Sequence, residues 1–439
     1  MIENDSSNIS KQEINQDSRN ERINRNMMLN NSTDSELPKS CLLSIADDLF
    51  SNDQQQIISG IIFFDNYSAL YKIPIDVEIK IQPFFVNFLC IPGAPIQLIN
   101  PCLRVLTSIA SSFSDSFDYS QLLCSLIQFL PNYYSFDAIC ALIGASNIVA
   151  FNFSQEPFLT NIDEWLNSNN QDYYSGAIGI LNALANHEEI SQAIKPIYAK
   201  LIDNFSQLNI SLKIQCIETF TNLLNVSTFW CSYFENCANL SYIFNYKEDS
   251  NQMEALILAT LRFLKIFIQN CQCDPIQMII NTQAIDILMN GLTNIKSIIR
   301  IESIWSLFYL FHKINETPEF VWRLNIPQIL INLDQDDKFS DYEMRIDTLC
   351  IICLLSPNVS LFVESNFTQM ICDNIDSFSN HVVDKIESAI LIMLQFAQST
   401  NNIEYLKNVA RNDQLHNYLF KNQTEKASLI MDIIDSVCE

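Results

Sequence analysis

An apolar, helix-length segment recurs along this chain about every 40 residues, and this recurrence limits the possible folds more than any other feature. Each copy carries apolar side chains at the three- and four-residue spacing of a buried helix face. The copies are CLRVLTSIA (102–110), AICALIGA (138–145), AIGILNALA (177–185), CIETFTNLL (216–224), TLRFLKIFI (260–268), ESIWSLFYL (302–310), DTLCIICLL (347–355) and ESAILIML (387–394). With residues 104, 140, 179, 218, 262, 305, 349 and 388 taken as equivalent, the intervals are 36, 39, 39, 44, 43, 44 and 39 residues.

A unit of this length is too small to bury its own apolar face, so neighbouring units have to stack into a solenoid. A period near 40 residues is typical of armadillo and HEAT repeats. Several copies follow a second apolar segment, such as IKPIYAKLIDNF (194–205), and this two-part unit favours the armadillo form. Glycine, at 6 residues, is too scarce for the many tight turns of sandwiches and barrels. We predict an all-α fold, a right-handed α-solenoid of about nine or ten armadillo-like repeats over residues 41–437.

The first 40 residues differ from the rest of the chain. They are rich in Asn and Ser and poor in apolar residues, so they bury too little surface to offset the entropy of ordering, and we predict a disordered tail. They contain no apolar core of a secretory signal, and no apolar run in the chain reaches the ~18 residues of a membrane span. We therefore expect a cytoplasmic protein whose 14 cysteines are reduced and mostly buried.

The charge balance limits the partners. The chain has 25 basic and 50 acidic residues, a net charge of −25, which repels the phosphate backbone and disfavours nucleic acid. An acidic surface suits basic protein partners, but it also serves as a plain solubility device, and composition leaves both interpretations open.

Four segments resemble the importin-α family. Residues 73–111, IPIDVEIKIQPFFVNFLCIPGAPIQLINPCLRVLTSIAS, are similar to its first full repeat, whose last helix reads WALTNIAS in the family. Residues 273–310 resemble the middle of the array, residues 362–397 a late repeat, and residues 410–435 the final helices. The resemblance is low and spread over residues 50 to 437. It implies a non-enzymatic adaptor for nuclear protein import, which binds a protein segment on its concave face and shuttles between cytoplasm and nucleus.

In that family, the third helix of each repeat presents a Trp and, one turn later, an Asn. The Asn amide bonds the backbone of an extended peptide, and the Trp rings hold the stems of Lys or Arg side chains. The Trp positions are here Arg104, Cys140, Gly179, Glu218, Arg262, Trp305, Leu349 and Ser388. The Asn positions are Ser108, Gly144, Ala183, Asn222, Ile266, Tyr309, Cys353 and Ile392. Only Trp305 and Asn222 keep the family's side chain, and Arg262 falls where the family itself carries an Arg. The resemblance thus implies a groove whose preference has diverged from basic nuclear-localisation signals.

The helix KSIIRIESIWSLFYLF (296–311) carries a second stripe beside its apolar face. The apolar face consists of Ile301, Ile304, Leu307, Phe308 and Phe311. The stripe consists of Glu302, Trp305, Tyr309 and His312, within an arc of roughly 80°. We interpret the stripe as binding surface; the alternative is that Trp305 packs against the neighbouring repeat. The complete predicted groove set is Trp305, Tyr309, Glu302, His312, Asn222, Arg262, Ser108 and Arg104.

The importin-β-binding segment of the family is a dense basic block. Residues 1–37 offer only Lys11, Arg19, Arg22 and Arg25 against seven acids. A solvated tail is therefore the favoured interpretation, and importin-β is not an expected partner.

The sequence favours neither catalysis nor a cofactor. His187, His312, His381 and His416 lie in separate repeats, and no His-x-x-x-His spacing exists, so we predict no metal site. The CxxC of Cys350 and Cys353 lies in an apolar helix without a second pair, and packed thiols are the better interpretation. Asp334, Asp336 and Asp337 lack the regularly spaced ligands of an EF-hand, so we interpret this segment as a loop between helices. The alternative to an import adaptor is an armadillo scaffold for protein–protein interaction without a transport role.

Overall fold

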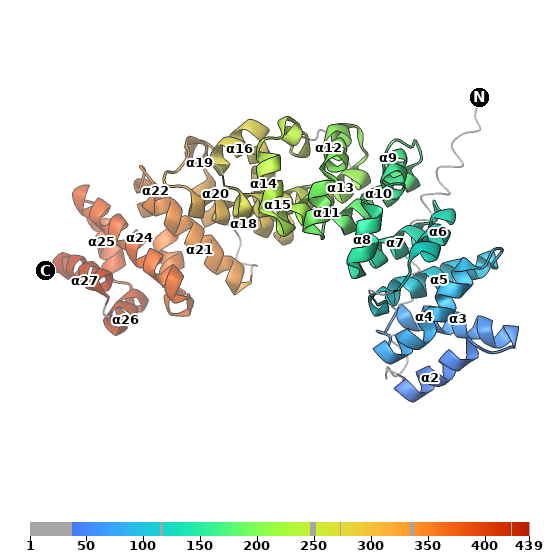
Figure 1. Cartoon of the computed structure of the whole chain (residues 1–439). Coiled ribbons are helices and arrows are strands. Elements are labelled where there is room, and N and C mark those ends of the chain that lie inside the picture. Colours follow the sequence, from blue (N-terminus) through green and yellow to red (C-terminus); the bar gives the residue numbers. More distant parts are fainter. Residues whose placement is uncertain are drawn as a thin grey trace, which may run out of the picture. The chain divides into compact units, whose positions relative to one another are not determined.

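The computed structural model of the 439-residue chain describes residues 37–114, 117–245, 252–272, 274–333, 338–422 and 424–438 (Figure 1). Every regular element within these ranges is a helix, and no strand occurs there, as predicted. Residues 1–36, which make up almost all of the predicted tail, lie outside the described residues. The chain divides into two compact units, Met1–Ser146 and Asn147–Glu439.

The first unit consists of two layers of helices. One layer contains α2 (Lys39–Asp48), α4 (Ile75–Cys90) and α6 (Ser120–Gln128), and the other contains α3 (Gln54–Ser68), α5 (Ile96–Ser108) and α7 (Tyr133–Ala145). A short 3-10 turn, η1 (Ala110–Ser112), follows α5. Successive helices alternate between the layers, and fully buried side chains such as Phe64, Phe85 and Leu106 fill the space between them. The core is therefore continuous along this stack.

Within its described residues, the second unit contains seven consecutive three-helix repeats. Each has a short first helix, a second helix and a longer third helix, and in one repeat the 3-10 helix η3 takes the second place. The first helices are α8 (Asn147–Phe153), α11 (Glu188–Ala193), α14 (Thr228–Glu235), α16 (Pro275–Thr282), α19 (Glu319–Arg323), α22 (Ser360–Val363) and α25 (Ile403–Ala410). The second are α9 (Phe158–Leu166), α12 (Lys195–Asn204), η3 (Ala238–Ile243), α17 (Ala284–Leu292), α20 (Ile326–Ile331), α23 (Phe367–Cys372) and α26 (Asp413–Lys421). The third are α10 (Gln171–Leu184), α13 (Ile210–Val226), α15 (Met253–Asn270), α18 (Ser297–Lys313), α21 (Phe339–Leu354), α24 (Asn380–Ser399) and α27 (Glu425–Cys438).

Third helices of neighbouring repeats pack side by side, α10 against α13 and onward to α24 against α27. In Figure 1, α18, α21 and α24 follow one another in this way. Each recurrent apolar segment of the sequence falls on a third helix or on its counterpart in the first unit. The prediction of an all-α solenoid of armadillo-like repeats is confirmed. Two further 3-10 turns, η2 (Phe205–Gln207) and η4 (Ile375–Ser377), precede α13 and α24.

Local sequence signals set the ends of the helices. The Asn209 and Asp274 side chains cap α13 and α16 by accepting a hydrogen bond from a backbone N–H of the first turn, a contact that contributes about 1 kcal/mol. Gln283 and Asn325, at the junction of first and second helices in consecutive repeats, adopt left-handed conformations with φ of 60° and 52°. A Cβ at Gly291 would lie 1.9 Å from Ser303 Oγ, so glycine is needed where α17 approaches α18. Among the described residues, no helix is long and apolar enough to cross a membrane.

Candidate protein-binding surface

Polar side chains connect third helices of neighbouring repeats at the repeat period. Asn222 Nδ2 donates to Asn182 Oδ1 at 2.8 Å, across 40 residues of sequence, and joins α13 to α10. Ser175 Oγ donates to Gln215 Oε1 at 2.9 Å, again across 40 residues. These bonds fix the register between repeats. Asn222 thus lies on a third helix, and part of its amide is bonded to the preceding repeat.

Arg104 and Ser108, the predicted groove residues of the first unit, lie on α5. The Arg104 guanidinium donates to both carboxylate oxygens of Asp65 on α3, with 2.6 Å between Nε and Oδ1, and lies over the Tyr134 ring at 4.8 Å. The hydrogen bond with Asp65 raises the pKa of Arg104. Ser108 Oγ donates back to the Arg104 carbonyl at 3.1 Å. Arg104 is therefore neutralised within the protein.

Glu302 and Arg262, predicted as separate groove residues, form one cluster. Glu302 accepts from Arg262 Nε at 3.2 Å and from Lys265 Nζ at 2.6 Å, so two cations of α15 hold one carboxylate of α18. The Glu302 side chain is only 13% exposed. An acid paired in this way does not serve as a free anchor for a basic peptide, because a new cation would have to displace an existing partner.

Trp305, Phe308 and Tyr309 form a half-buried patch on α18, which we call the α18 aromatic stripe. Trp305 stacks on Tyr309 with ring centroids 5.9 Å apart, and it meets Phe308 edge-on at 5.6 Å. The buried face of α18 contains Ile304, Leu307 and Phe311 as predicted, together with Ile299 and Leu310.

Phe308 and Ile301 were expected in that buried face but are only half-buried. The buried arc is rotated because α18 packs against α15, α17 and α21 at once, and the small Ser303 and Ser306 side chains admit these neighbours. Phe308 consequently lies with Trp305 and Tyr309 in the α18 aromatic stripe and not in the buried face where it was expected.

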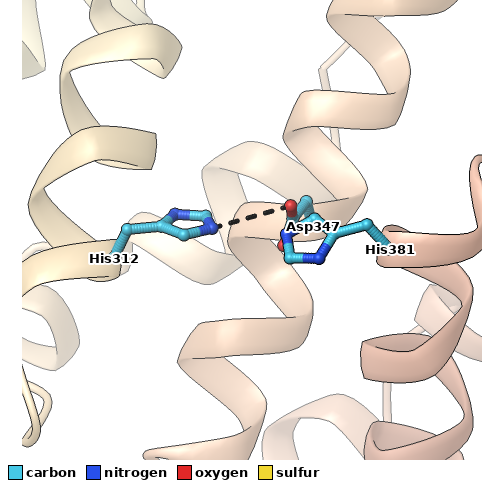
Figure 2. A group of neighbouring side chains, drawn as sticks. All are labelled: His312, Asp347 and His381. Carbon is cyan, nitrogen blue, oxygen red and sulfur yellow. Dashed lines mark ion pairs between the residues drawn. The ribbon is translucent and has the colours of Figure 1, made fainter.

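His312, one turn after Phe308 on α18, points toward residues of the next two repeats. Its Nε2 lies 3.7 Å from Asp347 Oδ2 on α21, and His381 on α24 completes a three-residue group (Figure 2). The Lys385 ammonium, also on α24, lies among these side chains. Sequence analysis missed this group because its members are 34 to 35 residues apart. This separation is close to the length of one repeat, and it was the sequence signal that could have revealed the group.

The cysteines within the described ranges are mostly buried, as expected, although Cys41 and Cys124 are exposed. Cys350 and Cys353 are both buried in α21, and burial raises the pKa of Cys353 to about 12. The CxxC is thus a pair of packed thiols, as predicted. Residues 334–337, which were predicted to form a loop, and residue 273 lie outside the described residues.

No protein-family model and no curated protein matches the sequence. Among solved structures, an engineered protein of the Northeast Structural Genomics Consortium matches with a TM-score of 0.62 at 12% identity, covering 91% of this chain and 99% of that chain. A designed armadillo repeat protein matches with a TM-score of 0.36 at 14% identity, covering 61% of this chain and 99% of that chain. The first similarity is one of fold alone. The three-helix units themselves make this fold an α-solenoid of armadillo-like repeats.

Proposed function

We propose that this protein is a non-enzymatic adaptor that binds a segment of another protein along its third helices, with the α18 aromatic stripe as the main contact. Stacked solenoid repeats present extended surfaces suited to this task. The observation that carries the proposal is the half-exposed packing of Trp305, Phe308 and Tyr309 on a helix that already has a full buried face. Trp and Tyr are the side chains most often found at binding hot spots.

Asn222 supports the binding of an extended segment. Its bond to Asn182 uses one N–H of the amide, and a primary amide has a second N–H and an oxygen with which to bond a peptide backbone. Asn222 and the stripe lie on α13 and α18, which are both in the third-helix row, with α15 between them. A peptide crossing the row would thus meet backbone-binding and side-chain-binding groups in turn.

The charges on this surface favour an apolar or aromatic cargo side chain over a dense basic signal. Glu302 on α18 is neutralised by Arg262 and Lys265 of α15. A run of Lys and Arg would find existing ion pairs at these positions instead of open carboxylates.

In its more specific form, the proposal is a divergent importin-α-like role in nuclear protein import. The resemblance of residues 73–111 to the first repeat of that family supports this form. The chain would then move between cytoplasm and nucleus with a cargo other than a basic signal. A scaffold without a transport role uses the same surface but remains in one compartment.

Affinity capture tests the proposal. Full-length protein should recover a defined partner, and the double variant Trp305→Ala/Tyr309→Ala should lose it. Tyr242→Ala is a matched control, because Tyr242 is an exposed aromatic on η3, outside the third-helix row. Equal recovery by the double variant and the control would contradict the proposal. A tagged copy that accumulates in or crosses the nucleus supports import, and one that captures its partner without nuclear entry supports the scaffold.

A further inference from the structure

The ligand atoms of His312, Asp347 and His381 converge on one point, which the Lys385 ammonium occupies. Lys385 Nζ lies 2.7 and 2.8 Å from the two Asp347 oxygens, 3.0 Å from His312 Nε2 and 2.9 Å from His381 Nε2. Two imidazole nitrogens and a carboxylate thus surround a single cation. The three side chains come from the third helices of three consecutive repeats, α18, α21 and α24 (Figure 2).

The protonation state of His312 suits a metal ligand. His312 Nδ1 lies 2.8 Å from the Phe308 carbonyl oxygen, and because a carbonyl only accepts, Nδ1 carries the proton. The lone pair is therefore on Nε2, which faces Asp347 and Lys385. Metal-binding histidines typically donate their other ring N–H to a carbonyl or carboxylate in this manner.

We propose that His312, Asp347 and His381 form a binding site for a divalent first-row transition-metal ion such as Zn²⁺, which replaces the Lys385 ammonium. Two histidines and one carboxylate with an open position are the ligand set of many zinc and non-haem iron sites. The ligand atoms all lie within 4.8 Å of one another, and one His312–Asp347 pair is at 3.7 Å. Zinc holds such atoms at about 2.0–2.2 Å, or about 3.3 Å apart in a tetrahedron, so modest side-chain rotation closes the site.

Lys385 and the metal ion compete for the same carboxylate. The Asp347 side chain is 2% exposed, so it requires a cationic partner, and the ammonium fills this role in the metal-free protein. Lys385 sits on a long flexible stem whose side chain is 16% exposed, and it can turn toward solvent when an ion enters. The fourth coordination position then falls to water or a partner side chain. An ion held in this way would tie three repeats together beside the α18 aromatic stripe.

Metal titration of the full chain tests the site. We expect one Zn²⁺ per chain by calorimetry, with His312→Gln and His381→Gln each weakening the affinity by more than about tenfold, since loss of even an outer-shell partner costs about ten- to a hundredfold. His187→Gln is the control, because His187 lies on another repeat. Bound Co²⁺ should show the visible absorption of a low-coordinate nitrogen and oxygen site without a thiolate charge-transfer band.

Removing the competing ammonium of Lys385 gives a second test of the site. Lys385→Met should bind Zn²⁺ at least as tightly as the wild-type chain. Its unfolding midpoint should fall in chelator and recover with Zn²⁺, because Asp347 is left without its cation until the metal arrives. Binding that is unaffected by both histidine variants, or a thiolate band in the cobalt spectrum, would overturn the assignment. So would the absence of Zn²⁺ binding in both the wild-type chain and folded Lys385→Met.

Discussion

Replacing Trp305 with alanine separates a surface role from a core role. Trp305 is half-buried and makes one stacked contact with Tyr309 and one edge contact with Phe308. Each aromatic pair contributes about 0.5–1.5 kcal/mol beyond the burial of area. Trp305→Ala removes these two contacts and only part of a full tryptophan's burial, so we expect the free energy of unfolding to fall by about 1–2 kcal/mol, below the 3–5 kcal/mol typical of a buried tryptophan.

Trp230 provides the matched control for this variant. It is fully buried on α14, its indole N–H donates to Ser191 Oγ at 3.1 Å, and Tyr198 packs against its ring at 5.2 Å. Trp230→Ala should therefore cost about 3–5 kcal/mol and leave a cavity. Only Trp305→Ala should combine near-normal stability with loss of the captured partner.

Urea unfolding followed by helical circular dichroism measures both variants. Repeat arrays can lose repeats piecewise, so hydrogen exchange resolved by helix should accompany it and show whether α15, α18 and α21 open early. Equal destabilisation by the two substitutions would refute the surface assignment of Trp305. A stable Trp305→Ala chain that still captures its partner would refute its role in binding.

Three further predictions follow from charges in the structure. A basic nuclear-localisation peptide should bind far more weakly in calorimetry than it does to an importin-α, because the Glu302 carboxylate is already paired with Arg262 and Lys265; low-micromolar binding contradicts this. Burial raises the pKa of the Glu78 carboxyl above its ordinary 4.5, so the folded state holds the carboxyl proton more tightly than the unfolded state does. The free energy of unfolding should therefore fall as the pH rises from 4.5 through the raised pKa of the folded state. Glu78→Gln should remove this loss and stabilise the protein at pH 7 in urea unfolding, whereas an unchanged pH profile speaks against it. Asp65→Asn should lower the free energy of unfolding by about 1.5–3 kcal/mol in the same assay, because it breaks a partly buried bidentate ion pair with Arg104. Asp47→Asn, which breaks an exposed ion pair with Lys80, should lower it by under about 1 kcal/mol. Equal losses would contradict the reasoning that burial makes the first pair the stronger one.

The repeat architecture was predictable because the third helices carry long, regular apolar faces. The short first helices, such as α19 (Glu319–Arg323) and α22 (Ser360–Val363), were not, since four or five residues are too few to show a helical period. The buried arc of α18 also escaped prediction, because it depends on which neighbours reach Ser303 and Ser306.

The candidate site was predictable only as far as it lies on one helix. The alignment of repeats placed Trp305 and Tyr309 correctly next to each other, one turn apart. It could not show that Glu302 is neutralised by Arg262 from the preceding repeat, since ion pairing depends on side-chain reach across helices. The meeting of His312 with His381 likewise requires knowledge of how α18, α21 and α24 stack.

Site-specific photo-crosslinking tests the central claim, that the third-helix surface is where this solenoid binds protein. A photoreactive benzoylphenylalanine would replace Tyr309 in one full-length chain and Tyr242, the exposed aromatic on η3, in another. Binding along the third helices predicts crosslinks at position 309 that map to one continuous segment of a single partner, and none to that partner at position 242. Crosslinks of equal yield at the two positions, or a partner captured at 242 alone, would contradict it.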